Sequence, residues 1–366
     1  KRPTIVGATA HQLGKLATLR TDEIGQFFDF MLVDEASQMD VAHAIVCFTT
    51  LAVGASVTVV GDNLQMAPIH PIDPPVGSEH IVGSIYDFYR NYRTNPDDEE
   101  RPSRAIGATM LNTSYRSNQE IVDFVVTTGY ENLTAAEPGQ RMGLLSPVPT
   151  ARPIDLAWSL PWSADMAKIL DPEEPLAAVI HSDPYSSQRN DSEAKLVASM
   201  VDALWGRLLA VDGKLLRGPD FFKKGVGIVT PHRAQQSAVV QYLTDALQPD
   251  DLTLEEMMRS VDTVERFQGQ EKLVMFASFG LGDGDQIAME EEFLYDLNRF
   301  NVIVSRAKTK MVVVMSRRLV DYLPTDLQAL RDSRLLKDFA GGYLRRSTPL
   351  SFPDLKDLGA CELRTR

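Results

Sequence analysis

The sequence predicts an α/β protein in which parallel sheets are covered by helices. Short apolar runs of strand length recur along the 366 residues, and amphipathic segments separate them. Several of these segments begin with residues that cap helices. The runs that we expect to form strands are Thr4–Ala8, Phe30–Val33, Val57–Val60, Ala178–His181, Val226–Val229, Leu273–Ser278 and Met311–Met315.

Helix starts can be located at two capping boxes and at one Thr-Pro pair. Ser117–Glu120 precedes an apolar segment that begins at Ile121, and Asn190–Glu193 precedes a longer amphipathic one. Thr230 and Pro231 follow an apolar run in the order expected for an N-cap and a first helical residue. We therefore expect helices to begin at all three places.

A polar stretch with two prolines divides the chain. We place a linker at 96–104, with a first domain over 1–95 and a second over 105–320. Residues 134–176 are rich in proline and are predicted to be an irregular connection within the second domain. The pattern does not assign a role to 321–366.

Composition limits the class of protein. Asp plus Glu number 50 against 37 for Lys plus Arg, so a nucleic acid would have to bind a local groove rather than a generally basic surface. Cys47 and Cys361 lie far apart and outside any CxxC motif, which argues against structural zinc and a disulfide framework. No apolar run reaches the length of a membrane span and no signal peptide opens the chain, so we expect an intracellular protein, cytoplasmic or, in a eukaryote, nuclear.

Two adjacent acids end the run Phe30–Val33. In nucleotide hydrolases the first acid of such a pair, here Asp34, holds Mg²⁺, and the second, here Glu35, can accept a proton from the water that attacks the γ-phosphate. A second apolar run ends in Gly61–Pro68, which could bring the amide of Gln65 close to the same phosphate. The two segments together indicate a phosphate site.

The second half of the chain offers further residues that could bind anions. Arg116 lies just before a helix start, where a surface role or a phosphate contact would both be ordinary. Thr230 could cap a helix, or its hydroxyl could bind a nucleic-acid phosphate. Glu271 follows a Gln-Gly-Gln turn and could accept hydrogen bonds from a ribose. Arg306 could stabilise charge on the γ-phosphoryl oxygens as an arginine finger.

Taken in order, these segments resemble six motifs of superfamily 1 helicases, in the branch typified by the nonsense-mediated-decay helicase and the Okazaki-fragment nuclease-helicase. The resemblance runs from about residue 4 to 316, with His232 in place of the tyrosine usual in that branch. The six matching segments are Asp34–Gln38, Gly61–Pro68, Ser114–Arg116, Thr230–Gln235, Val261–Glu271 and Asn301–Lys308.

The resemblance implies two tandem RecA-like P-loop NTPase domains and an ATP-dependent helicase or translocase that moves 5′ to 3′ on single-stranded DNA or RNA. It further implies that Asp34 coordinates Mg²⁺, that Glu35 is the catalytic base, and that Gln65 senses the γ-phosphate. Arg116 and Arg306 would contact that phosphate from the second domain. Gln268 and Glu271 would bind the nucleotide, and five residues would lie along the single strand: Thr9, Pro68, Thr230, His232 and Thr263. For Thr9 and Thr263, packing near a strand end is an alternative reason for a β-branched residue.

One departure from the family is large. The family's phosphate-binding loop, Gly-x-x-x-x-Gly-Lys-[Ser/Thr], does not occur, because Gly14-Lys15 has Thr9 in place of the first glycine and is followed by Leu16. The chain also opens at Lys1 without a methionine, so we expect the first domain to be incomplete at its N-terminus and these residues alone to be inactive. Two alternatives to a complete motor are a non-catalytic scaffold that binds nucleic acid or protein and a motor that feeds a fused nuclease.

Overall fold

The computed structural model forms two compact units, divided between Met110 and Leu111, and each is described by itself. Among the residues described, no helix has the length and apolar character needed to cross a bilayer. The structure describes residues 4–18, 27–68, 82–94, 109–146, 158–267 and 269–366.

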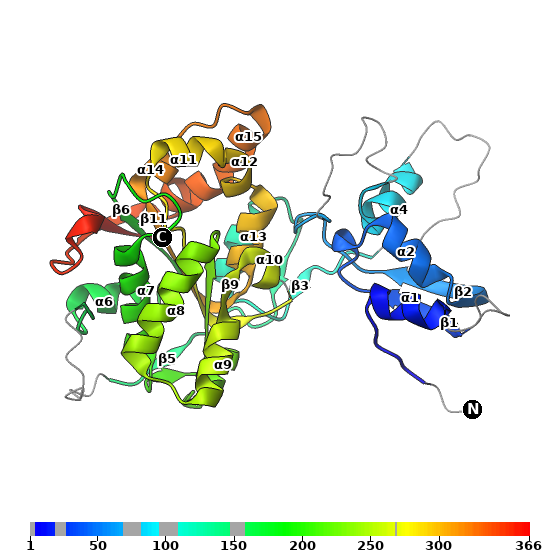
Figure 1. The fold of residues 1–366 in the computed structure, drawn as a ribbon, viewed down its shortest axis with the longest axis horizontal. Coiled ribbons are helices and arrows are strands. Elements are labelled where there is room, and N and C mark those ends of the chain that lie inside the picture. Colours follow the sequence, from blue (N-terminus) through cyan, green and yellow to red (C-terminus); the bar gives the residue numbers. More distant parts are fainter. Residues whose placement is uncertain (1–3, 19–26, 69–81, 95–108, 147–157, 268) are drawn as a thin grey trace. The chain divides into compact units, whose positions relative to one another are not determined.

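The first unit is built on a small parallel sheet (Figure 1). Strand β1 (Phe28–Val33) pairs with β2 (Leu51–Val59). The helices of this unit are α1 (Ala10–Thr18), α2 (Val41–Phe48) and α4 (Ile85–Thr94).

The apolar core of the first unit lies on one face of its sheet. Met31 and Val33 are buried in a cluster with Cys47 of α2 and Ile85 of α4. The alternate residue Leu32 points to the other face and is exposed, as successive side chains of a strand must point to opposite faces.

The second unit contains a seven-stranded mixed sheet. Five consecutive strands, from β6 to β9, run parallel to one another, and β13 is antiparallel to both strands beside it. The order across the sheet is β12 (Arg346–Leu350), β13 (Cys361–Thr365), β6 (Leu176–His181), β11 (Ala307–Ser316), β10 (Lys272–Ser278), β8 (Val226–Thr230) and β9 (Val261–Thr263).

Helices bury this sheet deeply. Every residue of β6, β8 and β10 is buried, which is the burial pattern of parallel strands covered on both faces. Its helices are α5 (Gln119–Val126), α6 (Ala164–Ile169), α7 (Asp191–Leu204), α8 (Arg233–Leu247), α9 (Asp251–Ser260), α10 (Val264–Phe267), α11 (Gly284–Met289), α12 (Glu291–Leu294), α13 (Leu297–Ser305), α14 (Arg317–Asp321) and α15 (Leu327–Lys337).

Two groups of side chains form the interior of the second unit. Val274 and Phe276 of β10 pack in one large cluster with residues of α7 and α8. Phe124 of α5, Phe300 of α13 and Phe339 form a separate aromatic group, with ring centroids 5.0 to 6.3 Å apart. The aromatic group ties α5 and α13 together; α5 follows the segment Ser114–Arg116, and α13 contains the start of Asn301–Lys308.

Six of the predicted strands are confirmed, and the seventh is wrong. Residues 4–9 form no regular structure, and Ile5 is 98% exposed. A strand needs a neighbour that accepts its hydrogen bonds, and no described residue pairs with this segment. Apolar character alone therefore predicted a strand where the structure has none.

The helix starts differ in detail from the predictions. Asn190 caps α7 as expected, since its side chain accepts from the backbone nitrogen of Glu193. At α5 the cap is Asn118 rather than Ser117, because the Ser117 hydroxyl donates instead to the carbonyl oxygen of Ala307. The N-cap of α5 therefore lies one residue after the predicted position, Ser117.

The last 46 residues, 321–366, belong to the second unit and extend its sheet. After α15 the chain forms the antiparallel pair β12 and β13, and β13 continues the sheet beside β6. Pro349 lies on β12, the outermost strand, where its missing N–H interrupts no pairing inside the sheet. The proline that obscured this region in the sequence is thus compatible with an edge strand.

Candidate nucleotide and nucleic-acid site

The acidic segment and the Gln65 segment lie side by side in the first unit. Because β1 and β2 are parallel neighbours, the loops that follow them emerge at the same edge of the sheet. The backbone nitrogen of Val60 donates to the carbonyl oxygen of Val33 at 2.8 Å, and that of Ala36 donates to Val60 at 2.8 Å. The nitrogen of Asp62 also donates to the hydroxyl of Ser37, at 3.4 Å.

Gly61 permits this close approach. A Cβ atom at this position would lie 2.9 Å from the backbone nitrogen of Ser37 and 2.8 Å from the ring of Tyr86. Backbone cannot yield as a flexible side chain can, so the loops can be this close only with glycine here.

Asp34 and Glu35 adopt a compact turn. The carboxylate of Asp34 is exposed and accepts from the backbone nitrogen of Glu35 at 2.9 Å. Glu35 lies in the left-handed region, with φ 51° and ψ 39°, which few residues other than glycine adopt. Its carboxylate accepts from the side-chain amide of Gln38 at 3.0 Å. Backbone strain of this kind is concentrated at functional sites.

Gln65 is oriented by Asp62. The Gln65 amide donates to one carboxylate oxygen of Asp62 at 2.8 Å, and the backbone nitrogen of Leu64 donates to the other at 3.0 Å. Asp34, Glu35 and Gln65 therefore lie in two loops that hydrogen bonds hold together. The phosphate site that the sequence predicts needs these three residues at the same edge of the sheet.

The two remaining predicted residues of the first unit lie before α1 and after Gln65. Thr9 is exposed, and its hydroxyl accepts from the backbone nitrogen of Gln12 at 3.3 Å, while the Gln12 side chain accepts from the nitrogen of Thr9 at 2.8 Å. This is a capping-box arrangement. Pro68 is partly exposed.

In the second unit, three segments distant in sequence meet at Glu271. Its carboxylate accepts from the Nε of Arg116 at 3.0 Å and from the ammonium of Lys308 at 2.5 Å. Burial raises the pKa of Glu271, but these two cations outweigh it and hold the pKa below its ordinary value. Arg116 also donates to the carbonyl oxygen of Ser305 at 3.0 Å. Lys308 was not among the predicted site residues, although it ends a predicted segment.

Arg306 comes directly after α13 and is buried. Its side chain is only 1% exposed, and its carbonyl oxygen accepts from the backbone nitrogen of Lys272 at 3.1 Å. A contact with a phosphate would require this guanidinium to become exposed. Gln268, the other predicted nucleotide contact in this region, lies outside the described residues.

The two threonines of this unit that are predicted to bind the nucleic-acid strand are neighbours. Thr230 and Thr263 are register partners on β8 and β9, and Thr230 is 1% exposed. The expectation that Thr230 caps α8 is wrong, because α8 begins at Arg233 after the N-cap His232, and the Thr230 hydroxyl donates to the carbonyl oxygen of His232 at 3.1 Å.

His232 is fixed by an acid. Its Nε2 lies 2.6 Å from a carboxylate oxygen of Glu290, whose other oxygen accepts from Gln188 at 2.7 Å and from Gln286 at 2.5 Å. The imidazole ring lies 6.0 Å from the ring of Phe293, centroid to centroid. These contacts fix the direction of the side chain at the start of α8.

Gln235 has a structural role. Its side-chain amide donates to the hydroxyl of Ser278 at 2.8 Å, and its oxygen accepts from the backbone nitrogen of Asn190 at 2.8 Å. A Cβ at Gly280, where φ is 65°, would lie 2.6 Å from the Gln235 side chain. The residue thus ties α8 to the end of β10 and to the start of α7.

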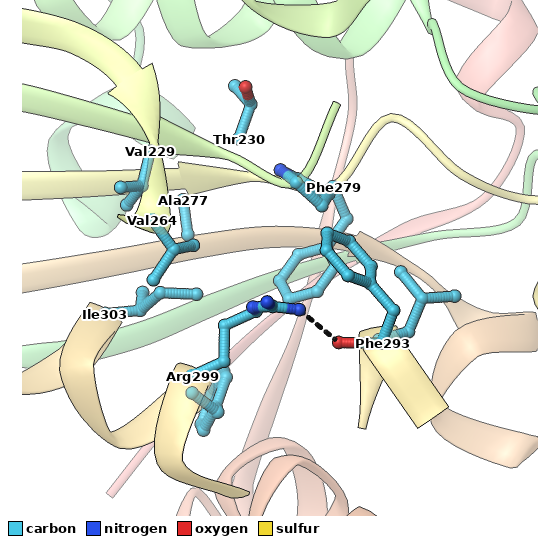
Figure 2. Close-up of a pocket in the computed structure, with 11 residues that line it drawn as sticks. Val229, Thr230, Val264, Ala277, Phe279, Phe293, Arg299 and Ile303 are labelled. Carbon is cyan, nitrogen blue, oxygen red and sulfur yellow. Dashed lines mark hydrogen bonds between the residues drawn. The ribbon is translucent and has the colours of Figure 1, made fainter. Parts of the chain in front are cut away.

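Thr230 and Pro231 contribute to the lining of a small apolar cavity. Its walls come from β8, α10, β10, α12 and α13, and Arg299 is the charged residue among those that line it (Figure 2). The guanidinium of Arg299 lies 3.9 Å from the ring centroid of Phe293 and pairs with Glu265 at 2.8 Å. Arg299 was also missed in the sequence, where it is seven residues before Arg306.

Comparison with known proteins gives one family and several relatives. The family model described as "AAA domain" matches residues 99–318. DNA polymerase alpha-associated DNA helicase A of Saccharomyces cerevisiae is 25% identical over 319 residues, which cover 85% of this chain and 41% of that protein. The DNA replication ATP-dependent helicase/nuclease DNA2 of Bos taurus is 24% identical over 306 residues, covering 78% of this chain and 24% of that protein.

Two further matches are a curated helicase from another organism and a solved structure. An uncharacterized ATP-dependent helicase of Methanocaldococcus jannaschii is 25% identical over 303 residues, which cover 81% of this chain and 37% of that protein. The PRRSV helicase structure is 13% identical and matches 82% of this chain and 36% of that chain. Its TM-score of 0.34 is too low to support a fold assignment. The chain spans less than half the length of these curated relatives.

Proposed function

Since the chain belongs to the AAA domain family, in the superfamily 1 helicase branch, we propose that it is the motor part of an ATP-dependent helicase or translocase on single-stranded nucleic acid. Its relatives are named as ATP-dependent or DNA helicases, which supports both the use of ATP and DNA as the substrate. Movement in the 5′ to 3′ direction is part of the proposal, from the resemblance of the motifs.

The observation that carries the proposal is the pair of linked loops that hold Asp34, Glu35 and Gln65. In this proposal Glu35 accepts the proton of the attacking water, and Gln65, oriented by Asp62, contacts the γ-phosphate. The strained backbone at Glu35 supports a functional role for this turn.

The exposed carboxylate of Asp34 fits Mg²⁺, which prefers oxygen ligands and is commonly held by one or two carboxylates together with substrate phosphates. Bound there, the ion would neutralise charge that develops on the phosphates. The 366 residues contain no Gly-x-x-x-x-Gly-Lys-[Ser/Thr] segment, so the proposal requires a phosphate-binding loop from outside them. These residues alone are then expected to bind ATP poorly and hydrolyse it hardly at all.

The second unit would supply the cations and the strand contacts. Arg116 and Arg306 would contact the γ-phosphate, while Glu271 would bind the ribose after giving up its present cation partners. In its described position Arg306 is buried, so a rearrangement around α13 is part of the proposal. The proximity of Thr230 and Thr263 supports a phosphate contact at the ends of β8 and β9.

The test uses the full-length protein and measures ATP hydrolysis with and without single-stranded DNA. Glu35→Gln keeps the shape of the side chain and removes the base, so the stimulated rate should fall by at least about 100-fold. Asp29→Asn is the control, because Asp29 is an exposed acid near the other end of β1, and its rate should stay within about twofold. Hydrolysis by Glu35→Gln at the unmodified rate would show that the assigned base is wrong.

A further inference from the structure

Arg299 contacts two different elements with one guanidinium. One of its terminal nitrogens donates to the carbonyl oxygen of Phe293 on α12 at 3.1 Å (Figure 2). The other pairs with the carboxylate of Glu265 on α10 at 2.8 Å. The planar group also lies over the ring of Phe293 at 3.9 Å, a favourable arrangement for a cation and an aromatic face. Arg299 itself is in the first turn of α13, so it links three helices.

The two partners of Arg299 are close to the residues proposed to bind the single strand. Glu265 lies two residues after Thr263, in the short helix α10 that continues from β9. The ring of Phe293 lies 6.0 Å from the ring of His232 at the start of α8. A nucleic-acid strand bound at Thr263 and His232 would therefore lie close to groups that Arg299 contacts directly.

The other end of α13 carries the proposed γ-phosphate contact. The helix spans Leu297–Ser305, and Arg306 follows it immediately. A hydrogen-bonded helix of this length moves as one body, so a change in how Arg299 is held is transmitted to the turn that places Arg306. The buried guanidinium of Arg306 needs such a movement to reach a phosphate.

The surroundings of Arg299 favour a second arrangement. Its Nε is buried and has no hydrogen-bond acceptor among the described residues, which raises the free energy of the present arrangement. The adjoining small cavity is lined mainly by apolar side chains from β8, α10, β10, α12 and α13.

We propose that Arg299 is a positioning residue that couples the binding of the single strand at α8 and α10 to the placement of Arg306 beside ATP. The proposal rests on the helicase function proposed above. Binding of the nucleic-acid strand alters the contacts of the guanidinium with Glu265 and Phe293. This change releases α13 from its present position.

The test measures ATP hydrolysis by the full-length protein with and without single-stranded DNA in Arg299→Gln, in Glu265→Gln and in the double variant. The rate without DNA should rise, because loss of the contact releases α13 as strand binding would, and the stimulation by DNA should therefore fall at least tenfold in each single variant. The double variant should be no worse than either single one, because both changes remove the same contact. Arg259→Gln is the matched control, since it breaks an exposed ion pair with Glu255 on α9 and should leave the stimulation intact.

A second measurement separates failure of this inference from failure of the proposed function. Hydrogen exchange of α13 should change when DNA is added to the unmodified protein and should not change in Arg299→Gln. If Arg299→Gln lowers both rates equally, or keeps full stimulation and the exchange response, the coupling role is overturned while the helicase function stands. If the unmodified protein neither binds the strand nor shows stimulated hydrolysis, the proposed function fails and the coupling fails with it.

Discussion

Lys310 offers a sharp test of the energetics of the second unit. It lies on the central strand β11 with its side chain fully buried, and its ammonium nitrogen donates to the carbonyl oxygens of Asp171 at 2.9 Å and Glu174 at 2.6 Å. Burial lowers the pKa of Lys310 to about 7, because a buried ammonium loses its hydration. The carbonyl contacts hold the turn that leads into β6.

The direction of the pH dependence follows from proton binding. In the unfolded chain a lysine keeps its proton up to about pH 10.4, whereas Lys310 in the folded protein releases it near pH 7. Between these values the unfolded state binds more protons, so the free energy of unfolding rises with pH. A difference of about 3.5 pH units corresponds to about 5 kcal/mol in total, of which about 3 kcal/mol should develop between pH 6.5 and 9.5.

The perturbation is Lys310→Met, which fills similar space and cannot titrate. The free energy of unfolding of the unmodified protein minus that of the variant should increase by about 3 kcal/mol from pH 6.5 to 9.5. Urea unfolding followed by tryptophan fluorescence suits this measurement, because Trp158, Trp162 and Trp205 all lie in the second unit. Lys308→Met is the control for losing a partly exposed ammonium from the same strand.

The result that would refute this reasoning is a difference that stays constant within about 1 kcal/mol across the pH range, since a single group with the stated shift must produce the larger change. Other titrating groups, Lys272 among them, are present in both proteins and cancel from the comparison. A constant difference would mean that the ammonium keeps its proton in the folded protein.

Two further outcomes concern stability. Glu35→Ala and Glu35→Gly both remove the carboxylate. The Glu35→Gly variant should be more stable than Glu35→Ala by about 1 kcal/mol in thermal unfolding, because glycine adopts the left-handed backbone conformation without strain. A Glu35→Ala variant of equal or greater stability would exclude strain at this turn. Backbone hydrogen bonds from Thr325 and Asp326, with one from the Tyr322 hydroxyl, lower the pKa of Glu291 to about 2. The contribution of the Glu291 carboxylate to stability is therefore present above its ordinary pKa near 4.5 and is lost as the pH falls toward 2. Glu291→Gln should accordingly lower the melting temperature at pH 7 but hardly at pH 2.5. An equal loss at both pH values would contradict the role of the charge.

Elements with strong local patterns were predictable from the sequence. The runs that became β6, β8, β10 and β11 are mainly apolar because both faces of those strands are buried, and that requirement leaves a clear trace in the sequence. The loops that carry Asp34 and Gln65 were also predictable, since each follows an apolar run of strand length.

Features that depend on tertiary contacts were not predictable. The segment Thr4–Ala8 has a strand-like sequence, but a strand also requires a pairing neighbour. The hairpin of β12 and β13 was missed because its strands are partly exposed and one carries Pro349, which local rules count against a strand. The importance of Arg299 comes from Glu265 and Phe293, which its position in the sequence does not reveal.

The position of β13 has a consequence for folding order. Strand β6 pairs with β11 on one side and with β13 on the other, and both partners are made much later in the chain. During synthesis the mainly apolar β6 therefore has both edges unpaired until the hairpin of β12 and β13 has emerged from the ribosome. Such a delay lowers the folding rate and exposes a segment prone to aggregation, so chaperones have most to protect in the interval between the synthesis of β6 and that of β13.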